Sequence, residues 1–164
     1  MIRESLLRRD SRYSHYVTHK EKMKIKLHHQ LVGSFIGSAI GDGFGYPTEF
    51  LRLNEIKDKY CPKGLTDPIG KVIQVTDDTQ MALAVSKAIM SSFKDGNIDN
   101  KDLEKNLIKE YISWLNDEQN NRAPGMTCIT SCENFERGQK WNDTTSRNSK
   151  GCGANMRALP FALL

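Results

Sequence analysis

Histidine is absent from most of this chain. All four histidines of the 164-residue sequence fall at positions 15, 19, 28 and 29. Histidine is the usual general base of Ser-His-Asp and Cys-His mechanisms. We therefore exclude such a mechanism for residues 30–164, unless an N-terminal histidine folds back onto them.

Cysteine is scarce and is not spaced for a zinc site. Cys61, Cys128, Cys132 and Cys152 include no Cys-x-x-Cys pair. Cys128 and Cys132 stand four residues apart and would share one helix face, so we interpret them as small core residues. Residues 1–30 also lack the continuous apolar stretch of a secretory leader. We expect a reduced, cytoplasmic protein.

Long apolar runs are missing as well. The uncharged run from Leu31 to Gly41 is too short to cross a bilayer, so we expect no membrane partner. Within it, Gly33, Gly37 and Gly41 repeat every four residues and would lie on one face of a helix. Glycine costs a helix about 1 kcal/mol relative to alanine. Three on one face therefore indicate tight packing or a site.

Positive charge is concentrated at the N-terminus. Residues 1–30 hold eight of the 24 Lys and Arg and three of the 20 Asp and Glu, which leaves 16 basic and 17 acidic residues for the remainder. The remainder is nearly neutral, so nucleic acid is an unlikely partner. We interpret residues 1–22 as a basic disordered arm or a misassigned start, with Met23 as the true start. An RNA-binding or targeting arm is the alternative.

The hydrophobic pattern predicts several helices. Apolar residues recur at three- and four-residue steps in four segments and again after Gly153. The remaining segments are rich in Gly, Pro, Asn and Ser, and we predict irregular structure at 51–70 and 138–153 and a turn at 94–97. The predicted helices run from Lys24 to Gly41, from Thr76 as N-cap to about Ser92, from Asp99 or Asn100 to about Leu115, and from Met126 to Glu136.

An acidic pair opens the second predicted helix. Asp77 and Asp78 follow Thr76 directly, where carboxylates favour the positive end of a helix. An ordinary helix start is one interpretation. The other is a cation site, because two carboxylates and two hydroxyls without His or Cys form an oxygen-only set that suits Mg²⁺, Mn²⁺ or Ca²⁺. Under that interpretation we expect both aspartates to face a cleft.

Two glycine-rich turns complete the candidate sites. Residues 41–50 form a flexible turn that presents Asp42 and Glu49. Residues 149–157, Ser-Lys-Gly-Cys-Gly-Ala-Asn-Met-Arg, run from a turn into a helix start. Backbone N–H groups of such a turn can bind an anion.

Together these segments resemble the ADP-ribosylglycohydrolase family. Four motifs in the family's order carry the resemblance, and they begin at Gly37, Thr76, Arg122 and Ser149. It implies an all-α, multi-helix orthogonal bundle around two Mg²⁺ or Mn²⁺ ions. The implied metal ligands are Thr76, Asp77 and Asp78; the implied catalytic residues are Glu49, Asp77 and Asp78; and the implied substrate-binding residues are Asp42, Ser149, Gly151, Cys152, Gly153 and Asn155.

The resemblance covers the N-terminal portion of the family domain, at residues 23–164. The family completes its metal site with an Asp-x-Asp-Thr motif, which is absent after Gly153, and the sequence stops within an apolar helix. We therefore expect an apparent truncation at the C-terminus, with further residues beyond 164.

The implied reaction is hydrolysis of the bond between ADP-ribose and a modified protein side chain or small molecule, through an oxocarbenium-like transition state. The base is Glu49 or a metal-bound carboxylate. One alternative is a catalytically inactive homologue that binds ADP-ribose or a partner, and another is a gene remnant without a stable fold.

Overall fold

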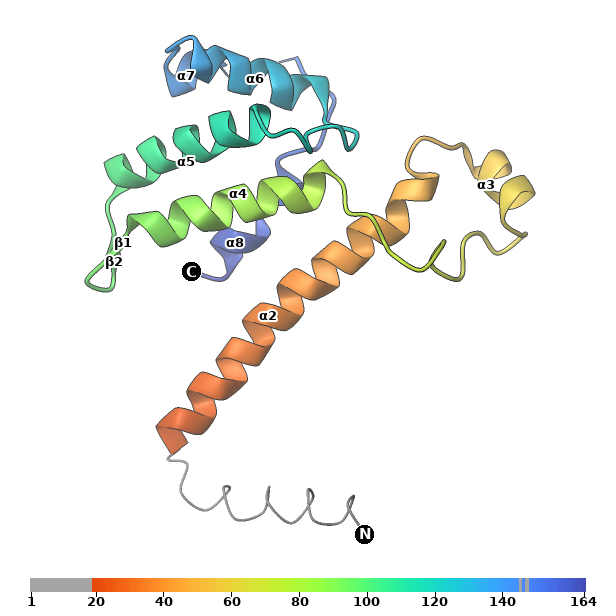
Figure 1. Cartoon of the computed structure of the whole chain (residues 1–164), viewed down its shortest axis with the longest axis horizontal. Helices are drawn as coiled ribbons and strands as arrows, with labels where there is room; N and C mark the ends of the chain where they lie inside the picture. The colour runs from red at the N-terminus through yellow and green to blue at the C-terminus, as the bar shows by residue number, and fades with distance from the viewer. Residues whose placement is uncertain (1–18, 145, 147) are drawn as a thin grey trace. The chain divides into compact units, whose positions relative to one another are not determined.

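A computed structural model describes residues 19–144, 146 and 148–164 of the chain. The chain divides into two compact units, residues 1–36 and residues 37–164. Most of the predicted basic arm lies outside the described residues. Figure 1 shows the helices that account for most of the described part. The prediction of an all-α fold is confirmed, with one two-stranded sheet beside the helices.

The first described helix, α2 (His19–Gly45), begins earlier than the predicted start at Lys24. Its glycines do not make the tight packing that their spacing indicated. A Cβ atom added at Gly33, Gly37 or Gly41 would meet no described atom within 4 Å. The crowded glycine is instead Gly43, whose added Cβ would collide with Ile73 Cγ2 and lie 3.0 Å from the carbonyl oxygen of Gln74.

Three helices of residues 37–164 build the core. They are α4 (Asp77–Ser92), α5 (Asn100–Leu115) and α6 (Met126–Glu136), and they lie side by side in Figure 1. As the three- and four-residue spacing predicted, α4 buries one apolar face against α5, which in turn packs on α6. The buried apolar cluster comprises Met81, Ala84, Val85, Ala88, Ile89, Leu107, Tyr111, Trp114, Cys132 and Phe135.

A tight hairpin joins α4 to α5. Strands β1 (Phe93–Lys94) and β2 (Asn97–Ile98) pair antiparallel, with Phe93 opposite Ile98. The turn residues Asp95 and Gly96 have φ angles of 51° and 83°. Asn, Asp and Gly tolerate these left-handed angles best, which is why the predicted turn forms here.

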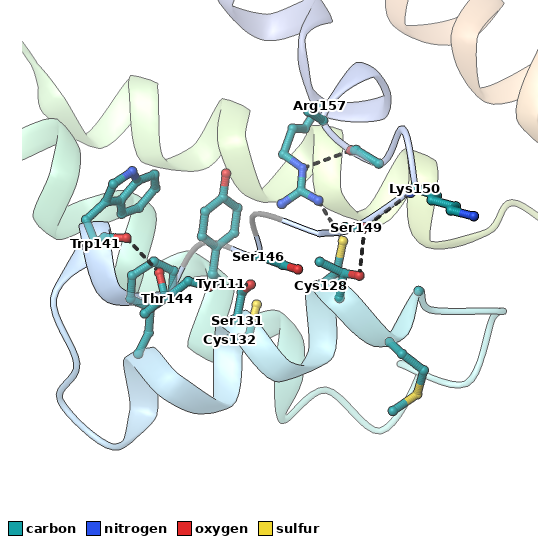
Figure 2. A pocket seen from close by; sticks show the side chains of 17 residues that line it. Tyr111, Cys128, Ser131, Cys132, Trp141, Thr144, Ser146, Ser149, Lys150 and Arg157 are labelled. Atoms are coloured by element: carbon teal, nitrogen blue, oxygen red, sulfur yellow. Dashed lines mark hydrogen bonds between the residues drawn. The ribbon is translucent and has the colours of Figure 1, made fainter.

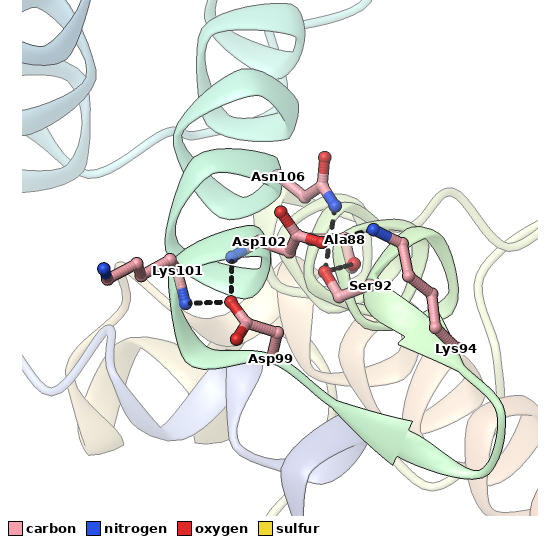
Figure 3. A network of polar contacts seen from close by, with 7 residues as sticks. All are labelled: Ala88, Ser92, Lys94, Asp99, Lys101, Asp102 and Asn106. Carbon is pink, nitrogen blue, oxygen red and sulfur yellow. Dashed lines mark hydrogen bonds and ion pairs between the residues drawn. The ribbon is translucent and has the colours of Figure 1, made fainter.

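Polar contacts next to the hairpin cap α5 and join it to α4 (Figure 3). The Asp99 carboxylate accepts hydrogen bonds from the backbone N–H groups of Lys101 and Asp102, which confirms Asp99 as the N-cap of α5. Asn106 donates from Nδ2 to the Ser92 hydroxyl over 2.9 Å, so α5 is tied to the last turn of α4.

The sequence analysis did not predict several short elements. α3 (Leu53–Lys59) lies in the segment predicted irregular, and α7 (Trp141–Thr144) lies in the second predicted loop. Both are too short for periodicity to show. The glycine-rich turn leads into the 3-10 helix η2 (Asn155–Arg157) and then α8 (Leu159–Ala162), and another 3-10 helix, η1 (Tyr46–Thr48), follows α2. No described helix is long and apolar enough to cross a membrane.

Candidate active site

The N-terminus of α4 holds the acidic motif. Thr76 is the N-cap: its backbone is extended, and its hydroxyl accepts a hydrogen bond from the Asp78 N–H over 3.3 Å. Thr76 and Asp77 are 3% and 6% exposed, whereas Asp78 is open to solvent. The two neighbouring aspartates therefore meet different surroundings.

Asp77 is held by the loop that carries the third motif. Its backbone N–H donates to the carbonyl oxygen of Arg122 over 3.1 Å, and its Oδ2 accepts from the Gly125 N–H over 3.4 Å. The Arg122 guanidinium also donates to the Val75 carbonyl over 3.3 Å. The sequence analysis quoted the segment from Arg122 to Thr127 without giving it a role. The structure shows that it supports the start of α4.

Asp42 of α2 lies against the same helix end. Its carboxylate accepts hydrogen bonds from the backbone N–H groups of Thr76 and Thr79 over 2.9 and 3.2 Å. It also accepts from the Thr76 hydroxyl over 2.6 Å and from the Thr79 hydroxyl over 2.5 Å. This approach needs Gly43, since a side chain there would collide with the segment that leads into Thr76.

These residues surround a cavity of about 550 Å³, here called the acidic cavity. Asp78 lies on its wall, but Asp77 does not, so the expectation that both aspartates face one cleft is met only by Asp78. Gly41 lines it too, so one of the striped glycines adjoins a site. Polar residues of three separate motifs meet here: Asp42, Glu49, Thr76, Asp78 and Asn155.

Partial burial and mutual repulsion raise the pKa values of Glu49, Asp77 and Asp78. The pKa of Glu49 is raised by desolvation, then by the charges of Asp77 and Asp78. Desolvation also raises the pKa of Asp77, although the Gly125 N–H opposes it. The pKa of Asp78 is raised by desolvation and by Asp42, and the cation of Arg157 counteracts this. A group of carboxylates that resist ionisation together favours a positive ligand.

The donors at this site are carboxylate and hydroxyl oxygens, the types that Mg²⁺ and Mn²⁺ prefer. Within residues 19–144, 146 and 148–164, however, no group of three or more His, Cys, Asp and Glu side chains is arranged to hold a metal ion. The described residues thus have suitable chemistry for a metal ion but do not complete a metal cluster.

A second cavity, of about 820 Å³, lies along the glycine-rich turn (Figure 2); we call it the turn cavity. The turn and α6 form its two sides, and they meet where the hydroxyls of Thr127 and Ser149 lie 3.1 Å apart. Ser149 also accepts from the Gly151 N–H over 3.1 Å. Tyr111, Phe135 and Trp141 supply its aromatic surface.

Arg157 lines the turn cavity without a carboxylate partner in the described part of the chain. Its Nε donates to the Gly153 carbonyl over 3.1 Å, and its guanidinium contacts Cys128 Sγ at 2.7 Å and lies 5.6 Å from the centre of the Tyr111 ring. The sequence analysis quoted Arg157 in a motif but gave it no role. Because η2 also places Asn155 on the acidic cavity, this short helix adjoins both cavities.

The predicted site residues thus divide between the two cavities. Ser149, Gly151 and Gly153 line the turn cavity, while Cys152 is exposed and lines neither. Asp77 lines neither cavity, and its hydrogen bonds to Arg122 and Gly125 hold the start of α4 next to the acidic cavity.

Comparison with known proteins identifies the family of this chain. The sequence model of the ADP-ribosylglycohydrolase family matches residues 23–164. The chain belongs to this family. It is 30% identical over 141 residues to the ADP-ribosyl-[dinitrogen reductase] glycohydrolase of Rhodospirillum rubrum, a match that covers 84% of this chain and 45% of the relative.

An uncharacterized protein of Archaeoglobus fulgidus is 27% identical over 133 residues, covering 79% of this chain and 41% of the relative. This family member therefore spans less than half the length of these two curated relatives. No solved structure gives a significant match.

Proposed function

We propose that this chain supplies the first part of an ADP-ribosyl hydrolase, which removes ADP-ribose from a modified protein side chain or from a small molecule. The observation that carries the proposal is the meeting of the Asp42–Glu49 turn, the Thr76–Asp78 motif and Asn155 at one acidic cavity. Family membership supports it, and so does the name of the Rhodospirillum relative, which specifies an ADP-ribosyl substrate on dinitrogen reductase.

The two cavities suit two parts of one ligand. We assign the ribose that carries the scissile bond to the acidic cavity. We assign the rest of ADP-ribose to the turn cavity, where the Gly153 N–H and the Ser149 hydroxyl can bind phosphate oxygens, while the Gly151 N–H holds Ser149 in place. Lys150 and Arg157 add positive charge, and the aromatic surface provides an apolar contact for a base.

We further propose that the acidic cavity binds two Mg²⁺ or Mn²⁺ ions, with Thr76 and Asp78 as ligands on its wall. Asp77, the third ligand that the resemblance implies, would have to turn from the Gly125 N–H to reach them. When bound, such ions would orient ribose hydroxyls and polarise a water molecule. Glu49 lies at the same cavity, and we assign to its carboxylate the proton of the attacking water. A carboxylate at the metal is the other candidate base.

The experiment joins this chain to the part of the Rhodospirillum relative that lies beyond the matched segment, with the intact relative as positive control. We expect ADP-ribose release that EDTA abolishes and that Mn²⁺ or Mg²⁺ restores. Asp78→Asn should abolish release, whereas Glu133→Gln, at an exposed ion pair with Arg137, should not.

Undiminished release in EDTA would contradict the metal site. A folded fusion that binds ADP-ribose but releases none, beside an active control, would contradict the hydrolase proposal and favour the binding homologue.

A further inference from the structure

In the described part of the chain, the hydrogen bonds to Asp42 come from two threonines of the acidic motif. Its Oδ1 accepts the Thr76 hydroxyl, and its Oδ2 accepts the Thr79 hydroxyl and the backbone N–H groups of both threonines. Three of the four donors share Oδ2, so the Thr76 hydroxyl has Oδ1 to itself. Asp42 therefore fixes where the protons of both threonine hydroxyls point.

This arrangement determines how the Thr76 hydroxyl is oriented. A hydroxyl has one proton and two lone pairs. The proton is directed to Asp42 Oδ1 at 2.6 Å, and one lone pair accepts the Asp78 N–H at 3.3 Å. One lone pair remains, and Thr76 lines the acidic cavity beside Asp78. An oxygen with its proton turned away and a lone pair available is a suitable cation ligand.

We propose that Asp42 is a positioning residue that turns the Thr76 hydroxyl so that its lone pair, and not its proton, is presented to the acidic cavity. This inference rests on the proposed function, in which Thr76 binds a cation. Asp42 then has a role distinct from the substrate contact that its place in the glycine-rich turn suggested.

Asparagine at position 42 tests this orientation with little change in shape. If its oxygen takes the place of Oδ2, three of the four hydrogen bonds are kept, and its NH₂ group then faces the Thr76 hydroxyl. Because two donors cannot bond each other, Thr76 must turn its lone pair toward Asn and its proton away. The opposite amide orientation would set NH₂ against three donors and is worse.

The control is Thr79→Val, which removes one hydrogen bond to Asp42 and leaves the Thr76 bond intact. The orientation is read from the hydroxyl proton resonances of Thr76 and Thr79 by NMR on this chain, and Mn²⁺ affinity is measured by calorimetry on the fusion described above. We expect Asp42→Asn to change the Thr76 hydroxyl resonance and to weaken Mn²⁺ binding about 10- to 100-fold, as is usual for residues that orient a metal ligand. Thr79→Val should weaken Mn²⁺ binding less than Asp42→Asn does.

Three results would separate the possibilities. An unchanged Thr76 hydroxyl resonance in Asp42→Asn would overturn the inference. Equal losses of Mn²⁺ affinity in Asp42→Asn and Thr79→Val would also overturn it, because they would show that Asp42 only links α2 to α4. If the Thr76 resonance changes in Asp42→Asn but the wild-type fusion binds no Mn²⁺, the orientation is supported and the proposed cation site is overturned.

Discussion

Gly43 offers the sharpest test of how the acidic site is assembled. A Cβ atom at this position would collide with Ile73 Cγ2 and would lie 3.0 Å from the Gln74 carbonyl oxygen. The first atom belongs to a β-branched side chain with restricted rotamers, and the second is backbone two residues before Thr76. Gly43→Ala must therefore displace the segment that leads into the acidic motif.

The magnitude follows from a comparison within one helix. Gly37 also lies in α2, and a Cβ there meets nothing within 4 Å. Alanine gains about 1 kcal/mol of helix propensity over glycine at either position, so this gain cancels in the difference between the variants. Overpacking at Gly43 remains, and it costs about 1–3 kcal/mol. We expect Gly43→Ala to be less stable than Gly37→Ala by that amount.

Urea denaturation followed by circular dichroism measures both free energies of unfolding. The double variant Gly43→Ala/Ile73→Ala provides a control, since removal of Cγ2 should make the added Cβ less costly in the Ile73→Ala background than in the wild type. The reasoning is refuted if Gly43→Ala proves as stable as Gly37→Ala, because the close approach between α2 and the segment before Thr76 would then not exist in solution.

Further predictions concern the acids, the thiols and the isolated chain. In the fusion described above, Asp77→Asn and Asp78→Asn should each abolish turnover with helical content retained by circular dichroism. Asp77→Asn should not lower the melting temperature, because its amide oxygen can still accept the Gly125 N–H and the buried charge, whose pKa is raised, is removed. Glu49→Gln should keep ADP-ribose binding by calorimetry and lose hydrolysis; normal turnover would place the base elsewhere. A thiol reagent at mildly alkaline pH should modify the exposed Cys152 and should not modify Cys132 until the chain is unfolded. The reason is that burial raises the pKa of Cys132 to about 12. Mass spectrometry of the labelled peptides measures both reactions. The 164-residue chain alone should self-associate, since Phe161 and Leu164 are 42% and 63% exposed. It should also show no hydrolysis, since its described residues do not complete a metal cluster. A monodisperse, active monomer on size-exclusion chromatography would contradict this expectation.

Local patterns determined the helical framework of this protein. α4, α5 and α6 follow the predicted segments because each has three or more turns with a repeating apolar face, and Thr76 and Asp99 cap the first two as their side chains favour. α3 and α7 were not foreseen, because one or two turns carry no readable period.

Local patterns in the sequence predicted only part of the site. The sequence identified the acidic motif and the two glycine-rich turns as chemically able segments, since residue type and spacing are local properties. Only the tertiary structure showed that Asp42 bonds to both threonines and that Asp78, but not Asp77, lies on the cavity wall. It also showed that the close approach is at Gly43 and not along the Gly33–Gly41 stripe. These outcomes depend on contacts between residues thirty or more positions apart, and a local pattern contains no information about which distant segment will supply them.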